Sequence, residues 1–386
     1  MSNDLKSEIL NWDVAVLLIA NSLAWTLPFE NNALLIIMCV VIGVFLIIKP
    51  RTILTLAPIP IIAISLFVFI EAFWEQPVLP KIWNKYLQEF IALGVPSLYI
   101  ARSDFNPGKV LRNIGLISLP LLPFIFGKNL SDNRDYGMWM GISYGIISYV
   151  IALIYNVFFQ YGKYIKRYLK YIFSLVLLGY LIFYIQYASR GSLIAVTIAI
   201  LLFTFIKLHI RFTKVFIIIS AIILLILTFW NEFILLFIEI LENFGIESFA
   251  LSKMIALQDL SNGRSDLLEQ GLRIFSSSPI FGHGVGIFEV TYESGYVHNC
   301  FIQFLIEGGI IYFSIMTFLI VSSFKFILSQ KVSDEKRMFL SFLICAGLIQ
   351  LLFSSYFWIS QMFWFLIGYT LKLLKKKNHS RVTTAK

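Results

Sequence analysis

Charged residues are scarce in this sequence. Asp, Glu, Lys and Arg make up 14% of its 386 residues, whereas soluble domains contain about 25%. This scarcity excludes an ordinary soluble domain, and the 59% of hydrophobic residues indicates an integral membrane protein. Acidic residues are also fewer than basic ones, 22 against 31, which gives a net charge of +9. In a membrane protein such an excess reflects topology and attraction to membrane lipids, so we expect no nucleic-acid partner.

Cysteine is nearly absent. Cys39, Cys300 and Cys345 lie far apart within apolar runs, and no CxxC spacing occurs. This spacing favours buried free thiols over a disulfide or a cysteine metal site.

Apolar runs, by contrast, are abundant. A membrane-spanning helix needs about 20 mostly apolar residues, and reading the runs between charged breaks predicts about twelve spans. They are residues 12–29, 33–48, 52–71, 86–101, 113–127, 137–159, 170–187, 192–207, 214–231, 298–322, 338–354 and 356–372. The predicted fold is therefore an all-α integral membrane protein, a single multi-span domain over residues 1–386.

The positions of lysine and arginine agree with this count. If the N-terminus is inside, 23 of the 31 fall on the inner side, as the positive-inside rule requires of short cytoplasmic loops. Both chain ends are then inside, and residues 373–386 form a basic cytoplasmic tail. Residues 232–297, between spans nine and ten, form one large outer loop that contains short helices, and loops of that length are usually functional.

Within this loop the stretch "LSNGRSDLLEQGLRIFSSSP" predicts a helix. Asn262 is a suitable N-cap, Pro279 ends the helix, and Leu268, Leu272 and Phe275 supply an apolar stripe. These signals place a short amphipathic helix on the outer side.

Three outer arginines are candidate anion ligands. Arg264 in the first turn opposes the helix dipole unless an anion binds there, although contact with lipid headgroups explains it equally well. Arg273 lies nine residues on, on the opposite face, so the two are not expected to serve one site. Arg190 sits at the membrane surface in the tight turn before span eight, where an ionisable residue suggests function and headgroup contact is the alternative.

Two histidines flank the end of the outer loop. The "GHGVG" stretch around His283 lacks the pattern of a nucleotide-binding loop, and we interpret its glycines as folding the loop back over the spans. His298 begins span ten and faces the outer aqueous side, where histidine suits a general base. A metal site of His283, Glu289, Glu293 and His298 is the alternative, but its spacing matches no established ligand pattern.

The stretches "GRSDLLEQGLRIFSSSPIFGHGVGIF" and "HNCFIQFLIEGGI", together with "SRG" at residues 189–191, resemble the O-antigen ligase and polymerase superfamily. The resemblance implies a GT-C-like glycosyltransferase of the inner (cytoplasmic) membrane that faces the periplasm. Its donor would be an undecaprenyl-diphosphate-linked oligosaccharide, and no metal or other cofactor is expected. The partners implied are this donor, membrane lipids and a chain-length regulator protein.

The resemblance also assigns roles to residues. Arg190 and Arg264 would bind the donor diphosphate, and His298 would act as the base on the acceptor hydroxyl. Asn299, Arg273 and His283 are expected to bind substrate. Glu307 lies too far along the span to orient His298 and is expected to be structural, with Gly308 and Gly309 allowing close helix packing.

Three functions remain open at this point. The compact chain, rich in Phe and Ile, favours an O-antigen or surface polysaccharide polymerase over an O-antigen ligase that transfers the glycan to lipid A core. A flippase or secondary transporter is the alternative from another class. It is disfavoured because the chemistry-bearing residues lie on the outer side rather than near the bilayer midplane.

Overall fold

The computed structural model describes residues 2–26, 33–49, 58–75, 80–129, 136–160, 164–187, 189–209, 235–236, 238–240, 243, 264–292 and 297–384. Throughout these ranges the regular backbone is helical, without a β-strand. The expectation of an all-α fold is confirmed for this part of the chain.

The helices of the first half run from α1 to α10. They are α1 (Asn3–Thr26), α2 (Ala33–Ile48), α3 (Ile59–Glu75), α4 (Pro80–Glu89), the π-turn η2 (Phe90–Gly94), α5 (Val95–Ile100), α6 (Pro107–Asn129), α7 (Tyr136–Gly145), α8 (Ile147–Ile154), the π-turn η3 (Tyr155–Phe159), α9 (Arg167–Tyr187) and α10 (Arg190–Leu208).

The second half begins with two short helices and ends with a long one. The elements are α14 (Arg264–Ser277), α15 (Ile287–Tyr292), α16 (Cys300–Leu328), α17 (Asp334–Leu343), the π-turn η4 (Ile344–Leu348), α18 (Ile349–Leu351), the 3-10 turn η5 (Phe357–Ile359) and α19 (Gln361–Thr384).

Within the described residues, five helical segments are long and apolar enough to cross a membrane: Pro107–Gly127, Gly141–Phe159, Arg167–Tyr184, Gly191–Leu208 and Cys300–Leu328. Shorter apolar helices cover Ile36–Ile48 and Ile59–Phe73. Helices occupy most of each predicted span except 214–231, which lies outside the described residues. Several predicted spans are interrupted by π-turns, and the count of twelve stays a prediction.

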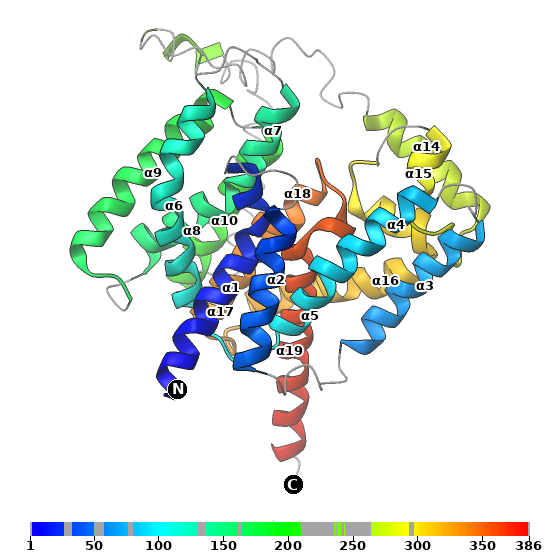
Figure 1. The fold of residues 1–386 in the computed structure, drawn as a ribbon, viewed down its shortest axis with the longest axis horizontal. Helices are drawn as coiled ribbons and strands as arrows, with labels where there is room; N and C mark the ends of the chain where they lie inside the picture. The colour runs from blue at the N-terminus through cyan, green and yellow to red at the C-terminus, as the bar shows by residue number, and fades with distance from the viewer. Residues whose placement is uncertain are drawn as a thin grey trace.

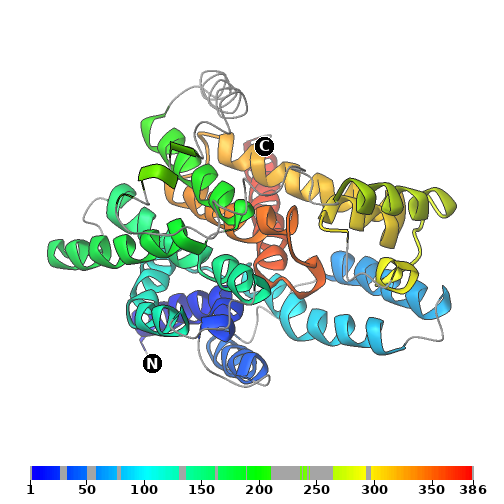
Figure 2. The ribbon, with the colours of Figure 1, turned by 90° about the horizontal axis from the view of Figure 1, so that it is seen from above.

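The helices form two lateral groups joined by a central one (Figures 1 and 2). Figure 1 shows α6, α8, α9 and α10 on the left and α3, α4, α14, α15 and α16 on the right. Between them lie α1, α2, α5, α17 and α19. Helix α1 begins and α19 ends at the lower edge of Figure 1, whereas α14 and α15 lie at the upper right.

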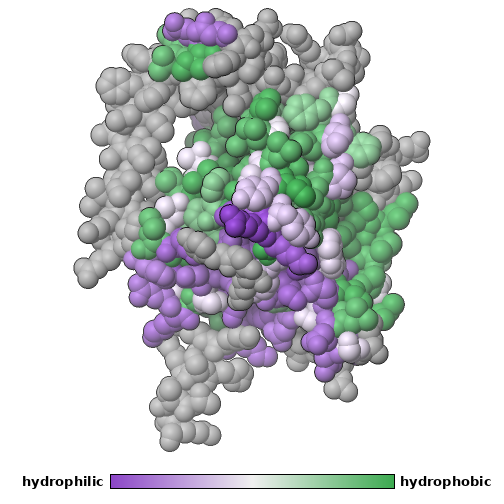
Figure 3. Space-filling model, turned by 90° about the vertical axis from the view of Figure 1, so that its left-hand side faces the viewer, coloured by the Kyte–Doolittle hydropathy of each residue, from purple (hydrophilic) through white to green (hydrophobic). Residues whose placement is uncertain are grey.

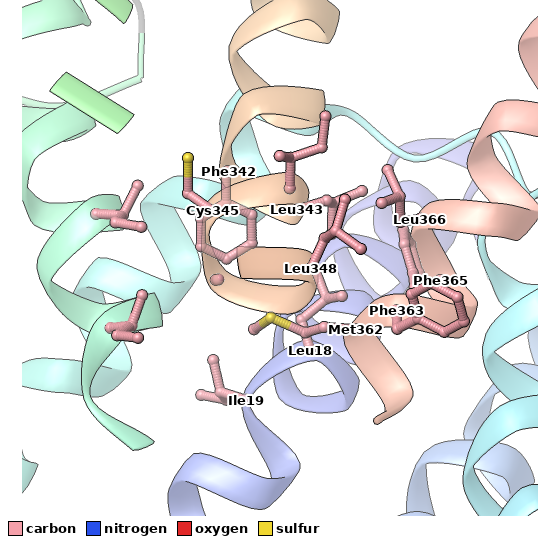
Figure 4. Close-up of a cluster of buried hydrophobic side chains, with 14 of the residues drawn as sticks. Leu18, Ile19, Phe342, Leu343, Cys345, Leu348, Met362, Phe363, Phe365 and Leu366 are labelled. Atoms are coloured by element: carbon pink, nitrogen blue, oxygen red, sulfur yellow. The ribbon is translucent and has the colours of Figure 1, made fainter. Parts of the chain in front are cut away.

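The central group packs around apolar side chains from α1, from α17 with η4, and from α19 (Figure 4). Leu18, Phe342 and Phe363 are fully buried there. A Cβ atom at Gly368 would lie 2.6 Å from the carbonyl oxygen of Leu98, so the glycine lets α19 approach α5 closely. Close packing at small residues is the usual way in which membrane helices associate.

Polar surface gathers toward the end at which α1 begins. Figure 3 shows hydrophilic residues gathered at the centre and lower left of the described surface, with mainly hydrophobic residues above and to the right of them. At this end Glu8 forms ion pairs with Lys109 at 2.7 Å and with Arg112 at 2.5 Å, which connect α1 to α6. The cysteines are free, but Cys39 is exposed, contrary to the expected burial. An apolar run does not distinguish a lipid-facing position from a packed one, because lipid and protein interior select the same residue types.

Candidate active site

The apolar helix α16 is broken at Gly309, where φ is 60° and ψ is −167°. A segment of the outer loop fills the break. The backbone N–H of Ile310 donates to the carbonyl oxygen of Pro279 at 2.9 Å. A Cβ atom at Gly309 would lie 2.1 Å from the carbonyl oxygen of Ile280, so only glycine fits here. Gly309 therefore provides a seat for the loop, which is a more specific role than the expected close helix packing.

In the part of α16 before the break, backbone carbonyl groups also form hydrogen bonds with the loop. The N–H groups of His283 and Gly284 donate to the carbonyl oxygens of Ile306 and Glu307, each at 2.9 Å. Irregular backbone at membrane depth is tolerated only where it is buried in protein or lines a cavity, because lipid offers no hydrogen-bond partners. The loop and the broken helix thus supply hydrogen-bond partners for each other's backbone groups.

The glycines of "GHGVG" allow this approach. Gly282, Gly284 and Gly286 have φ values of 87°, 82° and 82°, which side-chain-bearing residues rarely adopt. A Cβ atom at Gly284 would lie 2.2 Å from the backbone nitrogen of Ala72 in α3. The loop is therefore wedged between α3 and α16, in agreement with the interpretation that its glycines fold it back over the spans.

Glu307 lies beneath this loop and is fully buried. Its Oε1 accepts hydrogen bonds from the backbone N–H of Gly286 at 3.1 Å, from Gln303 Nε2 at 3.3 Å and from the hydroxyl of Tyr356. Its Oε2 accepts from Trp358 Nε1 at 2.7 Å. Because all four partners are donors, the site requires acceptor oxygens at both positions of the carboxyl group.

Tyr86 and Glu289 link Tyr356 back to the loop, so that these residues and Glu307 form a closed ring of contacts. Tyr86 donates its hydroxyl hydrogen to Glu289 Oε2 at 2.9 Å, and its ring lies 4.3 Å from that of Tyr356, centroid to centroid. Glu289 stands on α15, three residues after Gly286. We call Glu307, Tyr356, Tyr86, Glu289 and Gly286 the carboxylate ring. It connects α16, α15, α4 and the segment between α18 and α19.

Helix α14 packs on α16 through a face that differs from the predicted one. Ile274 is buried with Phe288, Val297 and Ile306, and Leu267 and Phe275 pack against them. The prediction of Leu268 and Leu272 in the apolar stripe was wrong, because these side chains are 39% and 45% exposed. The helix has apolar residues on two faces, and Gly271 decides between them. A Cβ atom there would lie 2.9 Å from Ile302 Cγ2, so the glycine side can approach α16 most closely.

The two arginines of α14 lie on different sides of the helix. Arg264 is its first residue and, by helical spacing, falls close to the face of Gly271 that packs on α16. Its side chain lies outside the described part. Arg273 points the other way, and its side chain, 72% exposed, forms an ion pair with Glu269 at 2.6 Å. This hydrogen bond to Glu269 raises the pKa of Arg273.

His298 and Asn299 form the start of α16. Asn299 is the N-cap: its Oδ1 accepts hydrogen bonds from the N–H groups of Phe301 at 3.0 Å and Ile302 at 3.3 Å. His298 precedes the cap in a left-handed backbone conformation with φ 57° and is half-buried. Such a conformation in a residue other than glycine is uncommon and tends to occur at functional sites. Asn299 therefore has a structural role that is independent of its predicted contact with substrate.

His283 is held within the loop. Its Nε2 lies 2.8 Å from Ser277 Oγ and 3.2 Å from the carbonyl oxygen of Ile274, and its backbone N–H donates to α16. These contacts join the end of α14 to the GHGVG stretch at residues 282–286, which we call the glycine loop. Its predicted role in binding substrate stays a prediction.

Arg190 begins α10, which lies in the lateral group with α6, α8 and α9, on the left of Figure 1. Ser189 caps this helix, since its Oγ accepts from the N–H of Ser192 at 3.2 Å. The side chain of Arg190 lies outside the described part, but the next residue fixes the position of the helix start. A Cβ atom at Gly191 would lie 3.0 Å from Phe353 Cβ. The segment that follows α18 therefore contacts the start of α10 and, three residues later, presents Tyr356 to Glu307.

Residues 173–317 match the protein family described as O-Antigen ligase. The resemblance to the O-antigen ligase and polymerase superfamily is confirmed. The searches of curated proteins and of solved structures found no match. With its membrane-length helices and this family match, the chain is a multi-pass membrane protein.

The matched region, residues 173–317, contains Arg190, Arg264 and His298, each within one residue of the start of a helix or helix cap. It also contains the glycine loop and Glu307. Among the described residues no group of three or more His, Cys, Asp or Glu side chains is arranged to hold a metal ion. Glu293, one member of the alternative metal site, lies outside the described residues.

Residues beyond the matched region complete the surroundings of Glu307. Tyr86 comes from α4, and Tyr356 and Trp358 follow α18. The sequence predicts no pairing of these side chains with Glu307. A carboxylate within an apolar span is itself a signal that partners exist, because an unpaired one is costly in a membrane. That signal does not identify the partners, which come from distant parts of the chain.

Proposed function

We propose that the protein is a GT-C-like glycosyltransferase that joins polyprenyl-diphosphate-linked glycan repeats on the outer face of the cytoplasmic membrane. The observation that carries this proposal is the O-Antigen ligase match over residues 173–317, which includes both candidate arginines and the candidate base. A ligase that transfers the glycan to lipid A core is the second candidate, favoured by the description of the matching family.

In the proposed reaction Arg190 and Arg264 bind the donor diphosphate. Each is the first residue of a helix, where free backbone N–H groups and the helix dipole also favour an anion. His298 accepts the proton of the acceptor hydroxyl as its oxygen attacks the anomeric carbon. The bond from that carbon to the diphosphate breaks, and the arginines stabilise the charge on the leaving group.

The burial of Glu307 supports an enzyme over a flippase. A transporter needs ionisable groups that face its substrate near the bilayer midplane. Glu307 is fully buried and its two oxygens are engaged by four protein donors. It therefore serves the protein's own packing and does not line a path for a substrate.

Deleting the gene and separating the surface polysaccharide on a gel should leave chains of a single repeat, because polymerisation is the missing step. Wild-type protein supplied in trans should restore the ladder and serves as the control. Free lipid-linked polymer would indicate a ligase instead. Precursor retained on the inner leaflet would indicate a flippase and would contradict the proposal.

Transfer by the purified protein on lipid-linked substrate should continue in excess EDTA. The reason is that two arginines are assigned the charge-neutralising role that a divalent ion has in other transferases. The measurement is the initial rate with and without chelator. If EDTA abolished activity and one divalent ion restored it, His283 and His298 would have to be reassigned as metal ligands.

A further inference from the structure

Glu307 is a fully buried carboxyl group inside a membrane-length helix. An ionisable side chain in such a position is costly and usually has a function. Direct contact with substrate is not available to it, because its side chain is fully buried and both oxygens already accept hydrogen bonds. It also lies nine residues after His298 in the sequence, and the part of α16 from Cys300 to Glu307 alone covers about 10 Å.

The donors around Glu307 belong to three separate parts of the molecule. Gly286 belongs to the outer loop just before α15, Gln303 to α16, and Tyr356 and Trp358 to the segment between α18 and α19. The carboxylate ring adds α4 through the hydrogen bond from Tyr86 to Glu289. One carboxyl group therefore determines how these parts meet.

Each of these parts leads to a residue of the proposed site. On one side Phe288 of α15 belongs to the same buried cluster as Ile274 of α14, the helix that Arg264 begins, and Val297, the neighbour of His298. On the other side the segment that carries Tyr356 contacts, at Phe353, the start of α10 beside Arg190. The helices that begin at or near Arg190, Arg264 and His298 are thus all connected to Glu307 through the packing contacts described here.

We propose that Glu307 is a positioning residue for the transfer reaction. Its carboxyl group holds the starts of α14, α16 and α10 in one frame, so that Arg264, His298 and Arg190 act on the same donor and acceptor. This inference rests on the proposed function. Geometry matters at this scale, since a displacement of about 1 Å at a reacting group can lower a rate about 10²-fold.

Glu307→Gln tests the proposal with nearly unchanged volume. The amide keeps one acceptor oxygen, but its NH₂ group must face N–H or O–H donors on one side. We expect the turnover number to fall about 10²-fold and the KM for the donor to rise as well, because His298 and the two arginines that bind the donor lose their common frame. Amide hydrogen exchange, measured by mass spectrometry, should become faster in residues 282–292, because the hydrogen bond from the Gly286 N–H to the carboxylate is weakened or lost.

Ser323→Ala is the matched control. Ser323 is buried in the same helix beyond the break and forms a side-chain hydrogen bond with Thr370 at 2.6 Å. Its removal should leave the turnover number per folded molecule and the exchange of residues 282–292 unchanged. If Glu307→Gln is not recovered folded, Trp358→Phe removes a single donor and should show the same effects more weakly.

The outcomes separate this inference from the proposed function. If the wild type transfers no glycan, the proposed function fails first. If the wild type is active and folded Glu307→Gln turns over at the wild-type rate, the positioning role is wrong. A loss of rate that merely follows the loss of folded protein, equal in the Glu307 and Ser323 variants, would overturn it as well.

Discussion

Replacing His298 by asparagine should lower the turnover number by about 10²- to 10⁴-fold, the usual contribution of a general base. Asparagine is the sharper substitution because it tolerates the left-handed backbone that this position requires, with φ 57°. It keeps the start of α16 intact and removes only the basic imidazole. The rate of glycan transfer and the affinity for the donor should be measured together, and donor binding should barely change.

His298→Ala is the companion variant. It removes the same base but also strains the backbone, so its activity should be no higher than that of His298→Asn and its thermal midpoint lower. The amount of protein in the membrane has to be measured for each, because misfolding of the outer loop would mimic a catalytic defect. Wild-type turnover by correctly inserted His298→Asn would show that the general-base assignment is wrong.

Arg264→Ala should lower kcat/KM for the lipid-linked donor by about 10²- to 10³-fold, the range found when one group that stabilises developing negative charge is removed. Arg264→Lys should recover only a small part of this loss, because the ammonium group keeps the charge but lacks the planar fork that binds a diphosphate with two hydrogen bonds. Initial rates over a range of donor concentrations would measure both variants.

Arg273→Ala is the matched control on the same helix. Arg273 lies on the face opposite Arg264 and is engaged by Glu269 at the surface, where ion pairs contribute little. Turnover should remain near the wild-type value in this variant, because the predicted contact of Arg273 with substrate would lie away from the diphosphate and the base. If Arg273→Ala were inactive and Arg264→Ala active, the donor site would lie on the other face of α14, and the assignment of Arg264 would have to be abandoned.

The sequence was sufficient to predict where most helices lie. Hydropathy and the distribution of Lys and Arg depend on local composition, and membrane helices satisfy their hydrogen bonds locally. For the same reason the predicted limits of α14, before Pro279 and around Arg264, agree with the observed helix Arg264–Ser277.

The break at Gly309 and the partners of Glu307 could not be predicted in this way. The sequence "FLIEGGIIYF" remains apolar through the break, so its hydropathy does not register it. The groups that fill the break and surround Glu307 come from residues 279–286 and 356–358, and their meeting is a matter of tertiary structure. The face of α14 was mistaken for a related reason. Its leucines occupy both sides, and the close approach at Gly271 selects one of them.

The seat of the loop in α16 also constrains the order in which the protein can be assembled. Until residues 279–284 arrive, the carbonyl oxygens of Ile306 and Glu307 and the N–H of Ile310 lack the partners that they have in the finished structure. Each such group left unsatisfied in hydrocarbon costs several kcal/mol, on the order that drives nascent segments to stay helical in the bilayer. On these grounds we expect an isolated α16 to form an unbroken helix, and the non-helical conformation of Gly309 to depend on the docked loop. The candidate active site is thus expected to form only once residues 279–284 have docked against α16.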